Sequence, residues 1–159
     1  MSKEKKTNAM RILDTAGIGY QEFQYDCKKF IDGIESTKAL GKPLEMSYKT
    51  LVLKGRSGGH CVMVIPVERE VDLKKAASAV GEKSVEMVHL KDITALTGYV
   101  RGGVSPIGMK KPFPTVIDES AILLDRMLVS GGRIGVSIEL APEDLARVTG
   151  ARFFDVVRD

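Results

Sequence analysis

The stretch YKTLVLKGRSGGHCVMVIP, residues 48–66, decides the fold. Two apolar runs rich in β-branched residues flank the five-residue segment GRSGG, a pattern typical of a β-hairpin with a short connection. Both runs are almost continuously apolar, so both faces of each strand have to be covered by other parts of the chain. The sequence therefore predicts a hairpin at the centre of a β-sheet.

Helical and strand patterns are mixed on both sides of this hairpin. N-caps, apolar residues at helical spacing and terminal glycines predict helices over 7–18, 33–42, 71–83, 90–98 and 141–150. Strands are predicted over 20–25, 84–89, 114–120, 123–132, 133–140 and 152–157. These elements do not form a regular βαβ series. We therefore predict an α+β fold with a mixed, mostly antiparallel, barrel-like sheet flanked by helices.

Length and composition are those of one globular unit. With 159 residues, 43% hydrophobic residues and a formal net charge of +3, the chain is expected to form a single domain over 1–159. No apolar signal region and no apolar run of membrane-spanning length is present, which predicts a cytoplasmic protein with no membrane partner. Of the two cysteines, Cys61 is expected in the core and Cys27 nearer the surface, without a disulfide framework.

The common catalytic motifs are missing from the sequence. There is no GxSxG elbow, no GxxxxGK[ST] phosphate loop and no glycine motif that opens a helix after a strand. His60 and His89 are interpreted as ordinary histidines rather than bases or ligands, and no His/Cys cluster could hold a metal. His60 and Cys61 are neighbours on a strand, so their side chains point to opposite faces. We therefore expect no metal and no cofactor.

The segment GYVRGGVSPIGMKK, residues 98–111, offers backbone and positive charge instead. Gly102 and Gly103 permit a positive φ and let a ligand approach the chain, so that N–H groups can be directed at a carbonyl or a phosphate. Pro106 stiffens the exit of the loop. Lys49, at the start of an apolar strand, either reaches solvent or points into a site. The alternatives are a plain tight turn in the loop and a solvated lysine at the strand end.

Four segments together resemble the YbaK branch of the prolyl-tRNA-synthetase editing-domain family, nearly end to end. They are YKTLVLKG (48–55), DLKKAA (72–77), GYVRGGVSPIGMKK (98–111) and LVSGGRIGVSIELAPEDLARVTGA (128–151). The resemblance implies a mixed, barrel-like sheet flanked by helices. It also implies a free-standing deacylase that removes cysteine mischarged onto tRNA(Pro), often in partnership with prolyl-tRNA synthetase. In this branch the thiol of the substrate is thought to attack its own ester carbonyl, so the protein positions the ester rather than attacking it.

The resemblance also implies roles for individual residues. Lys49 would hold the terminal adenosine or its phosphate and favour the developing charge. Gly102 and Gly103, with Ser105 nearby, would orient the aminoacyl group or its oxyanion. Pro106 would fix this loop in place.

Further residues would contact the substrate. Tyr25 matches a tyrosine that family members place at the pocket wall, and Lys110 and Lys111 would contact tRNA phosphates in a salt-sensitive manner. Ser137 is predicted to contact the substrate, although it stands where some close members carry an acidic residue. Ile134 stands where arginine is common, so that a phosphate contact is lost or moved to Arg133.

Three alternatives remain open at this stage. The protein could remove another amino acid, such as alanine or serine, with water as the nucleophile. It could bind an aminoacyl-tRNA or a nucleotide without turnover. The segment 98–111, called the glycine loop from here on, could also be only a turn in a scaffold, in which case Gly102→Ala would cost stability but no activity.

Overall fold

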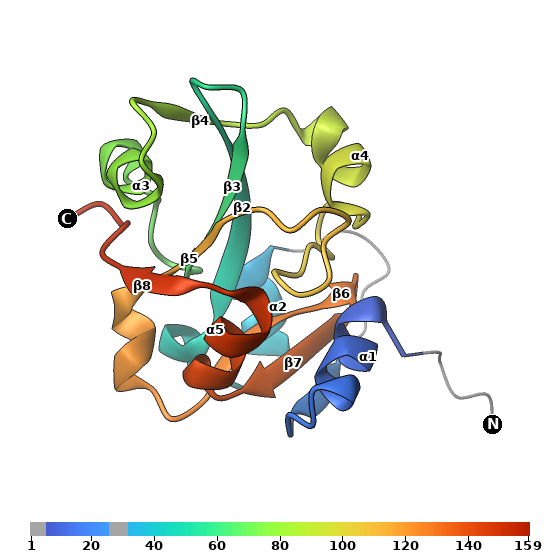
Figure 1. Cartoon of the computed structure of the whole chain (residues 1–159). Helices are drawn as coiled ribbons and strands as arrows, with labels where there is room; N and C mark the ends of the chain where they lie inside the picture. Colours follow the sequence, from blue (N-terminus) through green and yellow to red (C-terminus); the bar gives the residue numbers. More distant parts are fainter. Residues whose placement is uncertain (1–5, 26–31) are drawn as a thin grey trace.

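The computed structural model describes residues 6–25 and 32–159 (Figure 1). Its α-helices are α1 (Asn8–Thr15), α2 (Gly33–Ala39), α3 (Leu73–Val80), α4 (Ile93–Thr97) and α5 (Pro142–Thr149). Its strands are β1 (Gln21–Gln24), β2 (Tyr48–Gly55), β3 (His60–Pro66), β4 (Val85–Met87), β5 (Thr115–Asp118), β6 (Met127–Arg133), β7 (Val136–Leu140) and β8 (Arg152–Phe154). Short 3-10 helices span Leu44–Met46, Leu90–Asp92 and Glu119–Leu123.

The predicted central hairpin is confirmed. Strands β2 and β3 pair antiparallel from Tyr48–Pro66 to Lys54–His60. They occupy the middle of a sheet with the order β4-β2-β3-β5-β8. Two apolar clusters cover the two faces of this hairpin, one around Val62 and Val64 and the other around Cys61, Met63 and Ile65. The nearly continuous apolar runs of the hairpin therefore reflect strands that are buried on both sides.

The fold is the predicted α+β type, and most strand pairs are antiparallel. Among the described residues, only β3 with β5 and β5 with β8 pair in parallel. The barrel-like sheet of the prediction is divided into two sheets, and within the described residues these do not close into a barrel. The second sheet has the order β1-β7-β6, and an isolated parallel bridge between Ser47 and Leu128 links it to β2.

Local sequence signals explain most helix ends. Side chains of Thr7, Asp32 and Asp72 cap the N-termini of α1, α2 and α3. Gly81 and Gly150 follow α3 and α5 in the left-handed conformation. The segment predicted as one helix over 90–98 is a 3-10 turn followed by α4. The strand predicted over 114–120 ends at Asp118, where a 3-10 helix begins.

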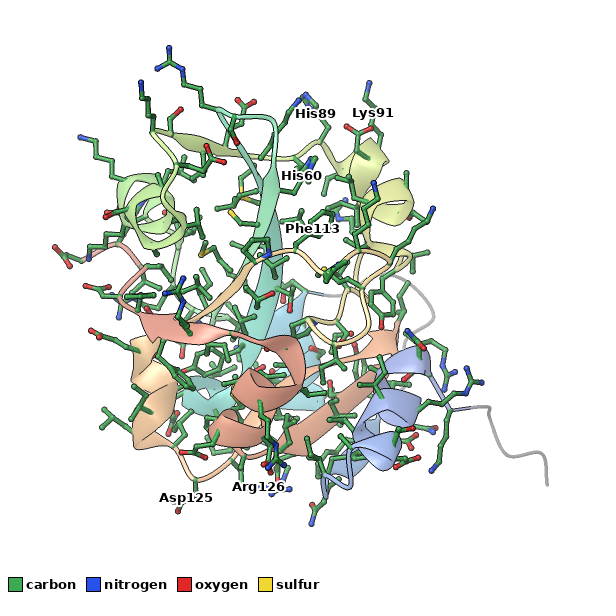
Figure 2. All side chains as sticks on the ribbon, in the orientation of Figure 1. His60, His89, Lys91, Phe113, Asp125 and Arg126 are labelled. Carbon is green, nitrogen blue, oxygen red and sulfur yellow. The ribbon has the colours of Figure 1, made fainter. Side chains whose placement is uncertain are left out.

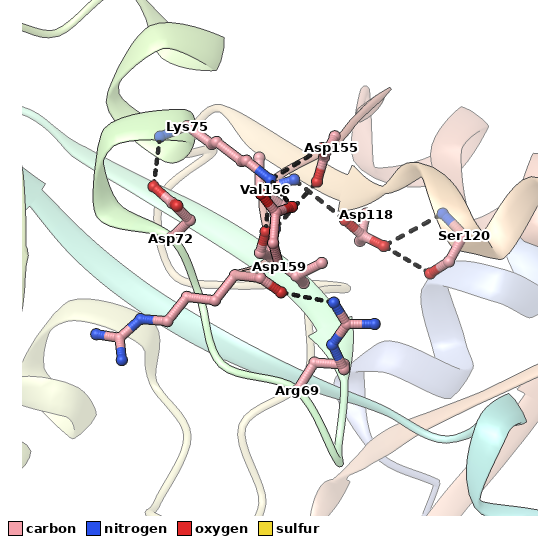
Figure 3. Close-up of polar contacts among 10 residues, drawn as sticks. Arg69, Asp72, Lys75, Asp118, Ser120, Asp155, Val156 and Asp159 are labelled. Atoms are coloured by element: carbon pink, nitrogen blue, oxygen red, sulfur yellow. Dashed lines mark hydrogen bonds and ion pairs between the residues drawn. The ribbon is translucent and has the colours of Figure 1, made fainter.

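The C-terminal segment is tied to the rest of the molecule by polar contacts (Figure 3). The Lys75 ammonium contacts the carboxylates of Asp155 and Asp159, each at 3.0 Å. The buried Asp118 carboxylate accepts hydrogen bonds from Val156 N at 3.1 Å and from the Ser120 hydroxyl at 2.6 Å. These contacts hold β8 beside β5 at the edge of the large sheet.

No helix in the described parts of the chain is long and apolar enough to cross a membrane.

Candidate functional site

A cavity of about 300 Å³ opens where the two sheets separate. Ser47, directly before β2, forms an isolated bridge with Leu128 of β6, and β2 and β6 are not paired beyond it. Residues Thr50, Val129 and Ser130 line the space between these strands. The remaining walls come from the start of α2, from the segment between β4 and α4, and from the glycine loop; among the residues there are Gly33, Ser36, Val88, Ile93, Gly102 and Val104.

Lys49 lines this cavity from β2 and is half-buried. Its ammonium group forms no hydrogen bond or ion pair with any residue in the described ranges. Burial lowers the pKa of its ammonium group below the ordinary lysine value, while the carboxylates of Glu70 and Asp32 act in the opposite direction. Lys49 is therefore, beside Arg101 of the 98–111 loop, a cation that an anionic or developing negative charge in the cavity would meet.

The glycine loop reaches the cavity through a tight turn. Gly103 N donates to Val100 O at 2.8 Å, and Gly102 has a φ of +88°. Such a φ is required at the third position of a type II turn, and it favours glycine. Gly102 lines the cavity, whereas Gly103 is buried behind it against the turn between β6 and β7. The turn thus exposes main chain, without a side chain, to a bound molecule.

Helix α1 and an internal hydrogen bond brace the rest of this loop. The buried Tyr99 hydroxyl donates to Ile107 O at 2.5 Å, and Asn8 Nδ2 donates to Gly108 O at 3.0 Å. A Cβ at Gly108 would lie 2.7 Å from Asn8 Nδ2. The glycine loop is therefore packed against its neighbours and held in one conformation.

Comparisons with known proteins identify the family. The family model of the aminoacyl-tRNA editing domain matches residues 31–148. The chain is 45% identical, over 98% of both chains, to an Enterococcus faecalis protein named "Putative Cys-tRNA(Pro)/Cys-tRNA(Cys) deacylase EbsC".

The chain belongs to the aminoacyl-tRNA editing domain family.

Two further relatives agree with this result. A solved structure described as "Crystal structure of a putative trans-editing enzyme for prolyl tRNA synthetase" superimposes on this editing domain with a TM-score of 0.84. It is 25% identical, and the match covers 98% of this chain and 100% of that one. A proline–tRNA ligase of Thermosipho africanus is 31% identical over 72 residues, which are 45% of this chain and 13% of the ligase. The resemblance found in the sequence is thereby confirmed.

The editing domain brings four of the predicted site residues to one cavity. Lys49, Gly102, Tyr25 and Ser137 all line it, although they come from different parts of the sequence. Tyr25 follows β1 and is fixed by a hydrogen bond from its N–H to Gly135 O at 2.9 Å. Ser137 lies on β7 and is half-buried.

The other predicted residues lie outside the cavity wall. Ser105 is fully buried, and its hydroxyl accepts a hydrogen bond from Ile107 N at 3.2 Å within the loop. Pro106 is buried beside it, and Lys110 and Lys111 are exposed at the end of the loop. The roles assigned to these four residues stay predictions, and Ser105 and Pro106 can affect the cavity only through the loop they stabilise.

Sequence reasoning missed several residues that line the cavity. Arg101 precedes the two glycines of the loop, and Ser130 lies on β6, where its hydroxyl accepts from Gly132 N at 3.2 Å. Thr50 and Leu51 follow Lys49 on β2. Thr50 could have been identified in the sequence as a lining residue, because it carries a hydroxyl directly after Lys49 in the strand. Ser130 could be found only from the pairing of β6 with β7 and its approach to β2.

The histidines and the buried cysteine lie elsewhere. His60 is half-buried near the far end of the hairpin and packs its ring against Phe113, with 5.4 Å between ring centroids, while His89 is exposed (Figure 2). Neither histidine lines the cavity. Cys61 is buried in the core, as predicted, and burial raises its pKa to about 11. The expectation for Cys27 falls outside the described residues.

The cavity can therefore position a substrate better than it can attack one. Its described lining contains a lysine, an arginine, the Asp32 carboxylate, several hydroxyl groups and exposed main chain, but no histidine or cysteine. Asp32 accepts a hydrogen bond from Glu35 N at 2.8 Å as the cap of α2. A serine or threonine hydroxyl is a weak nucleophile unless a base is beside it. Val52, Val67 and Val129 give part of the cavity an apolar wall.

Proposed function

We propose that this editing domain removes cysteine from mischarged tRNA(Pro) and acts on the tRNA in trans. The observation that carries the proposal is the meeting of Lys49 and Gly102 in one cavity whose described lining offers no activated nucleophile. The 45% identity to the deacylase-named Enterococcus protein supports the same activity. The substrate is an ester between the cysteine carboxyl and a ribose hydroxyl of the terminal adenosine.

In the proposed reaction the substrate provides its own nucleophile. The cysteine thiolate attacks the ester carbonyl, the S–C bond forms, and the C–O bond to the ribose breaks. The electron pair leaves with the ribose oxygen, which takes a proton and gives free tRNA. The remaining cyclic thiolactone is opened by water. An internal thiol held near its target gains a large effective molarity, so positioning alone can account for much of the acceleration.

The residues of the cavity have separate tasks in this scheme. The Lys49 ammonium stabilises the negative charge that develops on the carbonyl oxygen. Gly102 lets the aminoacyl group approach the main chain of the loop, because no Cβ stands in the way. The apolar wall of Val52, Val67 and Val129 disfavours water beside the reacting ester, so that it competes less with the thiol. Ser137 and Tyr25 bind other parts of the aminoacyl adenosine.

The deciding experiment measures hydrolysis of Cys-, Ala-, Ser- and Pro-tRNA(Pro) by the wild type, Lys49→Ala and Lys54→Ala. Lys54 is the matched control, since it lies on the same strand but is exposed and outside the cavity. Rapid loss of the cysteinyl ester alone, abolished only by Lys49→Ala, is expected. Homocysteinyl-tRNA should also be cleaved. Hydrolysis of the alanyl or seryl ester would instead indicate water as the nucleophile, and no hydrolysis would indicate a binding module.

A second variant separates the substrate thiol from a protein thiol. Cys27→Ser leaves the buried Cys61 as the only cysteine. The proposed mechanism requires that this variant keep wild-type activity on Cys-tRNA(Pro). A loss of activity on every ester would assign the nucleophile to Cys27 instead.

We further propose that the reaction takes place in the cytoplasm and that prolyl-tRNA synthetase is a partner. The similarity of part of this chain to a proline–tRNA ligase supports a shared tRNA substrate. Gel filtration of the editing domain with prolyl-tRNA synthetase, with and without tRNA(Pro), tests the partnership. Co-elution that depends on the tRNA is expected, and separate elution in both conditions would contradict it.

A further inference from the structure

Strand β2 turns an unpaired edge toward the cavity. Gly55 N donates to Gly59 O at 2.7 Å across the hairpin, so the odd-numbered residues of β2 direct their main-chain groups at β3. Val88 N donates to Val52 O at 3.2 Å, so the even-numbered residues direct theirs at the opposite edge. Thr50 is two residues before Val52 and therefore presents its N–H and C=O at that same edge.

Neither neighbouring strand covers this edge at Thr50. Strand β4 pairs with β2 only from Leu53 to Gly55. On the other side, β6 touches β2 through the isolated bridge from Ser47 to Leu128 and is not paired with it further along. Thr50 lines the cavity that fills this gap. Its main-chain donor and acceptor are thus available to a bound molecule.

The side chain of Thr50 adds a third polar group. Its hydroxyl oxygen is buried and is the one buried side-chain polar atom in the described ranges that lacks a hydrogen-bond partner. Native structures rarely leave such a group unpaired, because its lost hydration is not compensated. Thr50 shares its face of β2 with Tyr48 and Val52, which also line the cavity. A rotation of 120° about χ1 moves the hydroxyl to the position of the methyl group without moving the main chain.

We propose that Thr50 binds the primary α-amino group of the aminoacyl ester and so distinguishes it from the secondary amine of proline. This inference rests on the proposed deacylase function. The carbonyl and hydroxyl oxygens of Thr50 are acceptors, and within the aminoacyl group the amino nitrogen is the donor that suits them. Lys49 provides a donor for the ester carbonyl, which has no hydrogen to give.

Proline differs from cysteine at this nitrogen. Its ring replaces one N–H with a carbon, so one acceptor of Thr50 would lie unpaired against an apolar group. A site built to bind an N–H discriminates strongly against a ligand that lacks it. Thr50 would therefore help to spare the correctly charged Pro-tRNA(Pro).

The test combines a substitution with a modified substrate. Thr50→Val removes the hydroxyl with little change of shape, and Thr50→Ser keeps it. Each protein is assayed on Cys-tRNA(Pro) and on N-methylcysteinyl-tRNA(Pro), which keeps the thiol but has one N–H fewer. We expect Thr50→Val to lower kcat/KM for the cysteinyl ester roughly tenfold, as for one lost hydrogen bond to a ligand, and Thr50→Ser to retain most of it. The N-methyl ester should be poor for the wild type but should lose little further in Thr50→Val.

Stability gives the second readout. If the hydroxyl serves the ligand, Thr50→Val should melt no lower than the wild type, because it removes an unpaired buried group. Full activity of Thr50→Val on the cysteinyl ester would overturn the proposal, as would equal losses on both esters. If the wild type cleaves no ester, the proposed deacylase function is wrong. The role of Thr50 is then tested by calorimetry, which measures how tightly the wild type and Thr50→Val bind adenosine linked through an amide to cysteine or to proline. A preference for the cysteinyl compound that disappears in Thr50→Val would support the proposal, and an unchanged preference would overturn it.

Discussion

Gly103 packs against the main chain of Ile134, at the turn between β6 and β7. A Cβ placed on Gly103 would lie 2.9 Å from Ile134 N and 3.0 Å from Arg133 C. These are main-chain atoms in a strand connection, so they cannot move aside as a flexible side chain could. The 98–111 loop and the turn between β6 and β7 are therefore one packed unit, and this contact sets the position of Gly102 at the cavity.

The first prediction follows from this contact. Gly103→Ala should push the glycine loop away from the β6–β7 turn and destabilise the protein by about 1–3 kcal/mol, as overpacking does in well-packed regions. Activity on Cys-tRNA(Pro) should fall at least as strongly, since Gly102 moves with the loop. Urea unfolding and single-turnover hydrolysis measure the two effects. Gly19→Ala is the matched control, because nothing lies within 4 Å of its Cβ and its φ is not positive.

A second prediction concerns the brace of the same loop. Tyr99→Phe leaves the carbonyl of the buried Ile107 without the hydroxyl that donates to it at 2.5 Å. An unpaired buried acceptor costs about 1–3 kcal/mol, so the free energy of unfolding should drop by that amount. Hydrogen exchange should quicken in the loop. Unchanged stability would mean that water or another donor takes over the Tyr99 contact.

Local patterns predicted the hairpin of β2 and β3 and helices such as α1, α3 and α5, because each depends on residues close together in sequence. The division into two sheets could not be predicted in this way. It depends on where β6 and β2 separate after Leu128, and this involves segments about eighty residues apart. The predicted mixed, mostly antiparallel sheet is confirmed, but its division into two sheets was not foreseen for that reason.

The site was predicted in part, and for a similar reason. Lys49 and Gly102 were found because a lysine in an apolar strand and a double glycine are unusual in themselves, and family resemblance added Tyr25 and Ser137. Thr50 was missed, since a threonine in a strand is ordinary. Only the geometry shows that its hydroxyl has no partner and that its edge of β2 faces a cavity.

A third prediction concerns Cys61. Burial raises the pKa of its thiol to about 11, with a smaller contribution from Glu82, so the reactive thiolate is scarce at pH 8. In the Cys27→Ser variant, folded protein should react very slowly with iodoacetamide and unfolded protein rapidly. Mass spectrometry of the alkylated chain measures both. Fast alkylation of the folded protein, with activity lost in step, would make Cys61 a candidate nucleophile.

A fourth prediction concerns the charge of Lys49. Because burial lowers its pKa, the folded state binds this proton less tightly than the unfolded chain does. The charged Lys49 lowers the free energy of unfolding, and this loss is complete at a pH below the pKa of Lys49 in the folded state. The loss disappears as the pH rises toward the pKa of Lys49 in the unfolded chain. Stability attributable to Lys49 should therefore increase with pH through this window. NMR titration of 13C-labelled lysines should show one ammonium group that titrates below the others, and Lys49→Arg should remove that signal.

A substitution tests the same point at neutral pH. Lys49→Met keeps the length of the side chain and removes the charge, so it should melt at or above the wild-type temperature while it loses deacylase activity. Such a gain in stability with a loss of function is typical of a residue whose charge serves the ligand. A lower melting temperature would show that Lys49 has a structural role instead.

The last prediction concerns Lys110 and Lys111, which are exposed where the glycine loop ends. If they contact tRNA phosphates, the double Lys→Ala variant should bind tRNA(Pro) more weakly, and the logarithm of its affinity should fall less steeply with the logarithm of salt concentration. Binding of cysteinyl adenosine linked through an amide, which lacks those phosphates, should stay unchanged. Lys74 and Lys83 are exposed on and after α3 and do not line the cavity, so their double variant is the control. If log affinity depends equally on log salt concentration in both double variants, the acceptor stem binds another surface. If the dependence is smaller only in Lys110→Ala/Lys111→Ala, the tRNA runs from the cavity across the end of this loop.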